Sequence, residues 1–283
     1  RLGGVAAFHC ENGSLIAAME RERLAAGKTG AAGYPMTHPE AAEAEAVGRL
    51  LRLAQAADAP VILSPITCRE SLLELERARQ RGQSAYATTC PQYLLLDDSV
   101  YYEGENAGRY VCSPPLRDRS QQEPLWKALR RDSVQAVASS HRAFTLRQKE
   151  TDPQDFTAIP AGLPGAENRG ELLYTFGVSA RRLAPEDLCR VLSEAPARLC
   201  GLYPKKGVLQ PGSDADIVVY DPRASHVIRA DDSLSRSDYN PYEGFVTSGG
   251  VTQVYLRGRL AVDQGAVLPA PDGRYLPRGK NSL

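Results

Sequence analysis

The run His9-Cys10-Glu11 is the first place in the chain where side chains that could do chemistry stand together, and it follows the small apolar stretch 5–8. An imidazole beside a carboxylate can bind a divalent metal or move a proton. In sheets of parallel strands such groups collect at the carboxyl ends of the strands, so this position indicates a site. A lone histidine is more often a hydrogen-bonded core or surface residue, and His9 therefore needs partners from other strands.

Predicted strands and helices alternate through the first 200 residues, which is typical of a parallel sheet covered on both faces. The spacing of Ala, Val and Leu predicts a helix over 39–57, with Thr37 or His38 as its N-cap and Pro39 in its first turn. The strands are predicted at 5–8, 59–63, 84–88 and 133–141, and further helices near 69–81 and 125–129. Because polar residues follow these strands, we expect an α/β fold of the (β/α)8 barrel type.

The pattern changes beyond a helix predicted over 184–200. Strand patterns bounded by turn residues follow at 217–222 and 253–259. The tail is rich in Pro, Gly, Arg and Lys and is expected to form an arm between subunits. We predict a barrel portion over 1–200 without the early strands, a small β-rich subdomain over 201–264 and a tail over 265–283.

The composition excludes several classes of partner. Lysine plus arginine and aspartate plus glutamate both number 34, so the net charge of zero offers no footprint for nucleic acid or an anionic membrane. No apolar stretch approaches the roughly 18 residues that span a bilayer, and the N-terminus lacks the order of a signal peptide. The six cysteines show no CxxC spacing, and we expect reduced, mostly buried thiols. A cytoplasmic protein with small-molecule or protein partners is expected.

Eight runs in the sequence resemble, in order, motifs of the hydantoinase and dihydropyrimidinase family of cyclic amidohydrolases, which also includes the non-enzymatic collapsin-response-mediator branch. The resemblance covers the C-terminal two-thirds of a family member. The runs are HCENG (9–13), TCPQYL (89–94), CSPPLR (112–117), DFTAIP (155–160), GLPGAE (162–167), GLYPKKG (201–207), GSDAD (212–216) and DYNPYEG (238–244).

The resemblance implies part of a (β/α)8 TIM-type metal-dependent hydrolase barrel with a small C-terminal β-sandwich subdomain. In the family's enzymes two divalent metals, usually zinc, are bridged by a carbamylated lysine. That lysine and an HxH pair lie upstream of the HCENG run in the family, and we expect this range to lack them and the early barrel strands. The family also forms dimers and tetramers, so a homo-oligomer is expected.

Three of the family's metal ligands should fall within this range. His9 keeps its imidazole, whereas Pro65 stands at the position of a histidine and Ser140 at that of the aspartate in an Asp-His-Cys run. Proline has no side-chain donor atom, and a neutral hydroxyl supplies neither the charge that holds zinc nor a base. We therefore expect zinc to be absent or incompletely bound, with His9 as a remnant ligand, and assign no catalytic residue.

The expected substrate contacts are altered as well. Ala161 replaces the asparagine of the family's Ile-Pro-Asn-Gly segment, and Thr88 replaces the glutamate before Thr-Cys-Pro. Ser113 is retained as a substrate-binding candidate, although it is equally well explained as a turn residue before Pro114.

Two hypotheses remain from the sequence. In the first, the chain is a catalytically degenerate hydantoinase-like protein that folds, oligomerises and binds a partner, as the resemblance to the non-enzymatic branch implies, with a cyclic amide as a candidate ligand. In the second, it is an active zinc hydrolase that opens dihydropyrimidine or hydantoin rings through a rearranged site, for which Cys10, Cys68 and His141 are the available donors. Buried cysteines are common without any such role, and the pair Pro65 and Ser140 favours the first hypothesis.

Overall fold

The computed structural model describes residues 4–102, 107–150, 155–269, 273–280 and 282–283, which form two compact units. The parallel-sheet unit comprises Ala6–Arg169 and Ile228–Gly244. The antiparallel-sheet unit comprises Gly170–Val227 and Phe245–Leu283, with the first residues of the chain up to Val5. The domain boundaries expected near residues 200 and 264 stay a prediction. No helix within the described residues combines the length and apolarity needed to cross a membrane.

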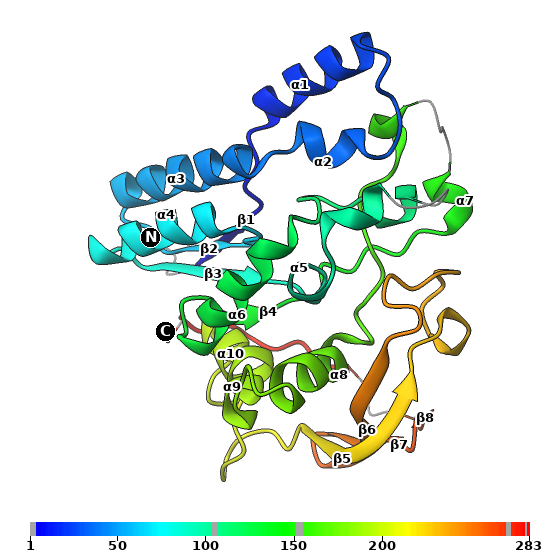
Figure 1. Cartoon of the computed structure of the whole chain (residues 1–283). Coiled ribbons are helices and arrows are strands. Elements are labelled where there is room, and N and C mark those ends of the chain that lie inside the picture. The colour runs from blue at the N-terminus through cyan, green and yellow to red at the C-terminus, as the bar shows by residue number, and fades with distance from the viewer. Residues whose placement is uncertain (1–3, 103–106, 151–154, 270–272, 281) are drawn as a thin grey trace. The chain divides into compact units, whose positions relative to one another are not determined.

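Four short parallel strands form the sheet of the first unit, in the order β1-β2-β3-β4 (Figure 1). Phe8 pairs with Leu63, and Leu63 with Ala87, so the first three strands end at the same edge. Every residue of β2 is buried, as expected for a strand covered on both faces. The strands are β1 (Ala6–Phe8), β2 (Val61–Leu63), β3 (Ala85–Thr89) and β4 (Ala136–Val137).

The strand predicted over 133–141 is much shorter in the structure. Only Ala136–Val137 pairs with β3, and Ser140, with a φ of 47°, has a left-handed conformation that ends the extended backbone before His141. His141 then forms a single parallel bridge to Leu163. The segment after β4 thus leaves the ladder and turns toward the residues around 163.

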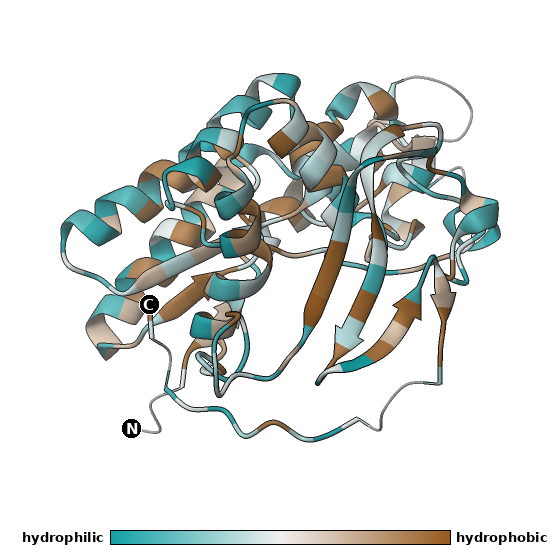
Figure 2. Cartoon of the chain, turned by 90° about the horizontal axis from the view of Figure 1, so that it is seen from below, coloured by the Kyte–Doolittle hydropathy of each residue, from teal (hydrophilic) through white to brown (hydrophobic). Residues whose placement is uncertain are grey.

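Helices connect these strands, as the sequence pattern predicts (Figure 1). Hydrophilic and hydrophobic residues alternate along them in Figure 2, and α3 buries Ala42, Val47 and Leu51 on one side. The helices are α1 (Gly13–Ala25), α2 (Gly33–Thr37), α3 (Glu40–Ala57), α4 (Arg69–Gln80), α5 (Pro91–Leu95), α6 (Gln122–Arg130) and α7 (Leu146–Lys149). Short 3₁₀ turns lie at Asp98–Tyr101, Ala107–Tyr110, Arg119–Gln121, Phe156–Ala158 and Ala230–Asp232.

The cap predicted for α3 is wrong. Pro39 is the N-cap residue, without a side-chain hydrogen bond, and neither Thr37 nor His38 caps the helix. The hydroxyl of Thr37 instead donates to the carbonyls of Gly33 and Tyr34, because Thr37 is the last residue of α2.

The second unit is built on an antiparallel sheet in the order β5-β6-β7-β8. Its first two strands are longer than predicted, and the pattern at 253–259 spans a turn rather than one strand. Arg257 and Gly258 have φ values of 50° and 77°, which fit a tight hairpin turn between β6 and β7. The strands are β5 (Ile217–Val227), β6 (Val246–Leu256), β7 (Arg259–Asp263) and β8 (Ala266–Val267).

The helix predicted over 184–200 consists of α9 (Pro185–Cys189), a π-helical segment at Arg190–Glu194 and α10 (Ala195–Leu199). Pro196 has no N–H to donate to the carbonyl four residues earlier, which accounts for the widened turn before it. A second π-helical segment, Tyr174–Ser179, follows α8 (Arg169–Leu173).

The described part of the tail contains no helix or strand after β8 and is attached to the end of α10. The backbone N–H of Gly279 donates to the carbonyl of Gly201 at 2.7 Å, and Nε of Arg278 donates to the carbonyl of Cys200 at 2.7 Å. An arm between subunits stays a prediction for this tail.

Candidate functional site

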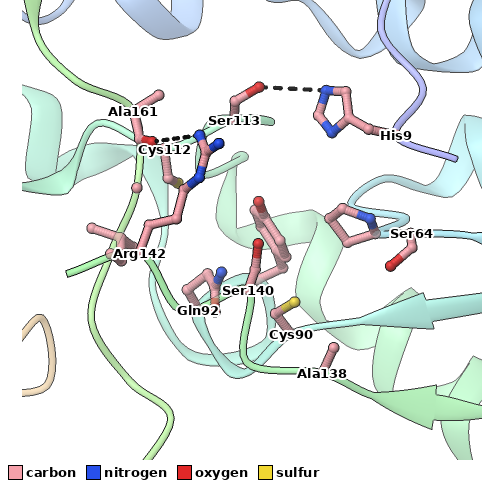
Figure 3. Close-up of a pocket in the computed structure, with 14 residues that line it drawn as sticks. His9, Ser64, Cys90, Gln92, Cys112, Ser113, Ala138, Ser140, Arg142 and Ala161 are labelled. Atoms are coloured by element: carbon pink, nitrogen blue, oxygen red, sulfur yellow. Dashed lines mark hydrogen bonds between the residues drawn. The ribbon is translucent and has the colours of Figure 1, made fainter. Parts of the chain in front are cut away.

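One pocket of about 410 Å³ lies at the carboxyl ends of the parallel strands (Figure 3). Because neighbouring strands run in the same direction, the residues that follow them meet at one edge of the sheet. His9 and Cys90 directly follow β1 and β3, Pro65 comes shortly after β2, and Ser140 shortly after β4. Loops complete the lining with Gln92, Tyr93, Cys112, Ser113, Arg142, Ala161, Gly162 and Leu163.

Five of the residues selected from the sequence line this pocket: His9, Pro65, Ser113, Ser140 and Ala161. Their chemistry does not fit a zinc site, because a catalytic zinc needs three protein ligands and only His9 of the three expected positions carries one. In the part of the chain that the structure describes, no group of three or more His, Cys, Asp or Glu side chains could hold a metal ion. The correspondence of residues 9, 65 and 140 to the family's ligands stays a prediction.

His9 is engaged by the neighbouring carboxylate of Glu11. Nε2 of His9 lies 2.8 Å from Oε2 of Glu11, and the hydroxyl of Ser113 donates to the same oxygen at 2.7 Å. Oγ of Ser113 is also 3.4 Å from Nε2 of His9 (Figure 3). Burial favours a raised pKa for Glu11, but the hydrogen bonds from His9 and Ser113 outweigh it and lower the pKa below its usual value. Glu11 is therefore a carboxylate that orients both side chains.

The alternative ligand set of Cys10, Cys68 and His141 is not assembled, since none of the three lines the pocket. Burial raises the pKa of both thiols to about 12, so neither is a thiolate near neutral pH. Nδ1 of His141 accepts the backbone N–H groups of Gly165 and Ala166 at 3.2 and 3.3 Å. That nitrogen holds a loop and is not available to a metal.

Two cysteines that sequence reasoning did not select do line the pocket, namely Cys90 and Cys112. Burial raises the pKa of Cys112 to about 11 and raises that of Cys90 as well. The thiol of Cys112 donates to the carbonyl of Pro114 at 3.3 Å. Both are neutral groups of the pocket wall. The place of Cys90 two residues after a predicted strand was an available signal, whereas Cys112 lies in a loop.

Arg142 brings a positive charge to the pocket and was also missed as a site residue. Its backbone N–H donates to the carbonyl of Leu163 at 2.9 Å, and Nη1 donates to the carbonyl of Ala161 at 3.3 Å (Figure 3). A Cβ added at Gly162 would lie 2.4 Å from Cβ of Arg142, so this contact requires glycine. The resemblance offered a signal, because it predicts that Arg142 stands at the cysteine position of the family's Asp-His-Cys run.

Thr88, expected in place of a family glutamate, pairs with the strand beside it. Its hydroxyl and that of Ser64 are 2.8 Å apart, next to Pro65 in the pocket wall. Ser64 lines the pocket, whereas Thr88 is not among the described lining residues.

A buried ion pair fixes the segment that follows Ser113. Nη2 of Arg117 donates to Oε2 of Glu43 at 3.0 Å, and Nε donates to the hydroxyl of Thr67 at 2.9 Å. The backbone N–H of Thr67 donates to Oε1 of Glu43 at 2.9 Å, and its hydroxyl donates to Oε2. Arg117 also donates to the carbonyl of His38. The network joins α3 to the segments after β2 and after Ser113.

Lys149 joins the two loops that carry Ser113 and Ala161. Its Nζ donates to the carbonyls of Val111 and Pro160, both at 2.7 Å, and the side chain is almost fully buried. Burial lowers the pKa of this amine to about 8. Since both acceptors are neutral carbonyls, Lys149 acts as a positioning residue for the pocket wall.

Comparisons with known proteins agree with this architecture. Residues 7–261 match a protein-family model that is described as "Amidohydrolase family". A D-phenylhydantoinase of Escherichia coli is 38% identical over 279 residues, which are 98% of this chain and 60% of that protein. A dihydropyrimidinase from Brevibacillus agri has a TM-score of 0.97 at 35% identity, covering 100% of this chain and 62% of that one. An L-hydantoinase (dihydropyrimidinase) from Arthrobacter aurescens has a TM-score of 0.88 at 30% identity, covering 94% of this chain and 58% of that one.

This chain thus spans about 60% of the length of the curated relative it matches. The parallel sheet with its helices is part of the (β/α)8 TIM-type barrel of these hydrolases, and the antiparallel sheet is separate from it. From the ordered motifs, the sheet and these matches, we conclude that the chain belongs to the amidohydrolase family and is similar to its hydantoinases and dihydropyrimidinases.

Proposed function

We propose that this protein is a hydantoinase-like amidohydrolase that no longer opens cyclic amides. The observation that carries the proposal is the presence of Pro65 and Ser140 in the pocket at the strand ends, where the resemblance leads us to expect a histidine and an aspartate. Neither residue supplies a zinc ligand of the ordinary kind.

The chemistry of ring opening makes these two losses decisive. Hydrolysing a ring amide near neutral pH needs a strong nucleophile, which a bound metal supplies by lowering the pKa of water toward 7. One imidazole does not retain a catalytic zinc against competing ligands, and His9 is in addition held by Glu11. The absent aspartate would also have moved the proton, a step worth about 10² to 10⁴ in rate. The pocket can therefore bind a small molecule without performing the reaction.

Metal analysis and turnover of the full-length protein test the proposal. We expect substoichiometric zinc in the purified protein, and no opening of hydantoin or dihydrouracil above a blank when zinc is added. Near-stoichiometric zinc together with ring opening would establish the active, rearranged site and contradict the proposal.

A pair of variants tests the two positions directly. Pro65→His/Ser140→Asp restores one imidazole and one carboxylate beside His9. Pro65→Ala/Ser140→Ala changes the same positions without adding ligands. More zinc per chain in the first variant than in the second supports the assignment of both positions, and equal zinc content counts against it.

The proposal includes assembly and location. The family resemblance leads us to expect a homo-oligomer, most simply a tetramer, in the cytoplasm, with a cyclic amide as a candidate ligand. Native mass spectrometry of the full-length protein measures the first, and a monomer at micromolar concentration would contradict it.

A further inference from the structure

We propose that the pocket binds a small organic carboxylate through the guanidinium of Arg142. This inference rests on the proposed loss of the metal site, because a metal in the pocket would itself attract such an anion. It assigns a ligand-binding role to a residue that replaces a family cysteine.

The position of Arg142 is set by its surroundings. Its backbone donates to Leu163, Nη1 donates to the carbonyl of Ala161, and its Cβ lies against Gly162. Figure 3 shows the side chain extended along the pocket wall beside Cys112. The guanidinium is thus presented at the pocket by three successive residues of the facing loop.

Most N–H donors of the Arg142 guanidinium form no hydrogen bond with the described residues. A guanidinium has five N–H donors in a planar fork, and the bond to Ala161 engages one of them. Across the described ranges of the chain, Arg142 forms no ion pair with a carboxylate. The carboxylate of Glu11 accepts from His9 and Ser113 through Oε2 and forms no ion pair with Arg142. A bound carboxylate would supply the missing acceptors in the bidentate geometry that arginine favours.

The other described lining groups favour a monoanion with further polar atoms. Apart from His9, Arg142 is the only basic residue among the described residues that line the pocket. Gln92, Ser113 and Ser140 offer neutral donors and acceptors around it. One fixed cation and a volume of about 410 Å³ match a small carboxylate, since pockets for small molecules begin at about 300 Å³.

Calorimetric titration of the full-length protein in EDTA-containing buffer at pH 7 tests the inference. The probes are hydantoate, a ureido carboxylate, and hydantoin, its neutral ring-closed counterpart. We expect hydantoate to bind at least about tenfold more tightly than hydantoin, as expected when a charge-assisted bond is gained. Equal affinities, or no binding of hydantoate, would overturn the inference.

Variants locate the interaction. Arg142→Gln should weaken hydantoate binding by about tenfold or more, and Arg142→Lys should lie between Gln and the wild type because it keeps the charge but loses the fork. Arg147→Gln, which removes an exposed charge outside the pocket lining, should leave binding unchanged. Circular dichroism confirms that each variant is folded. Unchanged binding in folded Arg142→Gln, or equal losses in both glutamine variants, would refute the role of Arg142.

Failure of this inference is separable from failure of the proposed function. Chromatography of the hydantoin samples after incubation with zinc reports ring opening independently of binding. Ring opening contradicts the proposed function and with it the premise of the inference. Absence of both ring opening and hydantoate binding contradicts the inference alone.

Discussion

Replacing Arg117 by methionine should destabilise the parallel-sheet unit severely, because Arg117 neutralises a buried carboxylate. The side chains of Glu43 and Arg117 are 0% and 5% exposed. In the variant, Oε2 of Glu43 would keep only the hydroxyl of Thr67 as a donor, and the carbonyl of His38 would lose the donor from Arg117. Breaking a buried pair in this way costs about 3–5 kcal/mol.

Two further variants make the argument quantitative. Lys127→Met removes one member of an exposed pair with Glu123, whose side chains are 52% and 59% exposed, and should cost about 1 kcal/mol or less. Glu43→Gln/Arg117→Met removes both buried charges while a side-chain oxygen still accepts from Thr67. The double variant should be more stable than Arg117→Met alone, because no buried charge is left uncompensated.

Urea unfolding followed by the fluorescence of Trp126 provides the assay. Trp126 is the single tryptophan of the chain, is 2% exposed and lies in the same unit as the ion pair. The reasoning is refuted if Arg117→Met loses no more free energy of unfolding than Lys127→Met. It is also refuted if the double variant is less stable than Arg117→Met.

Two other perturbations have defined outcomes. Burial lowers the pKa of Lys149 from an unfolded value of 10.5 to about 8, so below pH 8 the charged amine costs the folded state about 3 kcal/mol. Between pH 8 and pH 10.5 the unfolded state binds more protons than the folded state, so the stability of the wild type should rise relative to that of Lys149→Met. Urea unfolding of both proteins at pH 7 and pH 10 measures this. The same difference in free energy of unfolding at both pH values would contradict the prediction. Gly33→Ala would put a Cβ 2.4 Å from the ring of fully buried Phe156 and should cost about 1–3 kcal/mol. Gly30→Ala, where a Cβ would meet nothing within 4 Å, is the control, and equal unfolding midpoints would refute the steric argument.

The parts of the fold that could be predicted from the sequence are those in which buried residues recur at a regular local spacing. β2 and α3 follow their predicted ranges closely, because a short continuous apolar run is typical of a buried strand and apolar residues at helical spacing are typical of an amphipathic helix. The helix α1 was not predicted, and the structure gives the reason: Ile16 is its single buried residue among those described, so it carries almost no apolar stripe. Its start is instead marked by Asn12, whose side chain accepts the N–H of Leu15.

The site residues also differ in how far the sequence predicts them. Residues directly after strands, such as His9 and Cys90, can be expected at one edge as soon as the strands are recognised as parallel. Residues from loops depend on contacts between distant segments. Cys112 reaches the pocket in a loop whose carbonyl at Val111 is bound by Lys149, 38 positions away in the sequence, and no local pattern contains that information.

The contacts that position the pocket wall are separate from the two positions at which we propose that metal ligands were lost. The ion pair of Glu43 with Arg117 and the bridge from Lys149 involve neither Pro65 nor Ser140. The loss of metal ligands that we propose at those two positions therefore removes no support of the wall, and the pocket has a volume of about 410 Å³ with Arg142 in its lining. Because different residues position the wall and supply its charge, the proposed loss of a hydrolytic metal is compatible with the proposed binding of an anion.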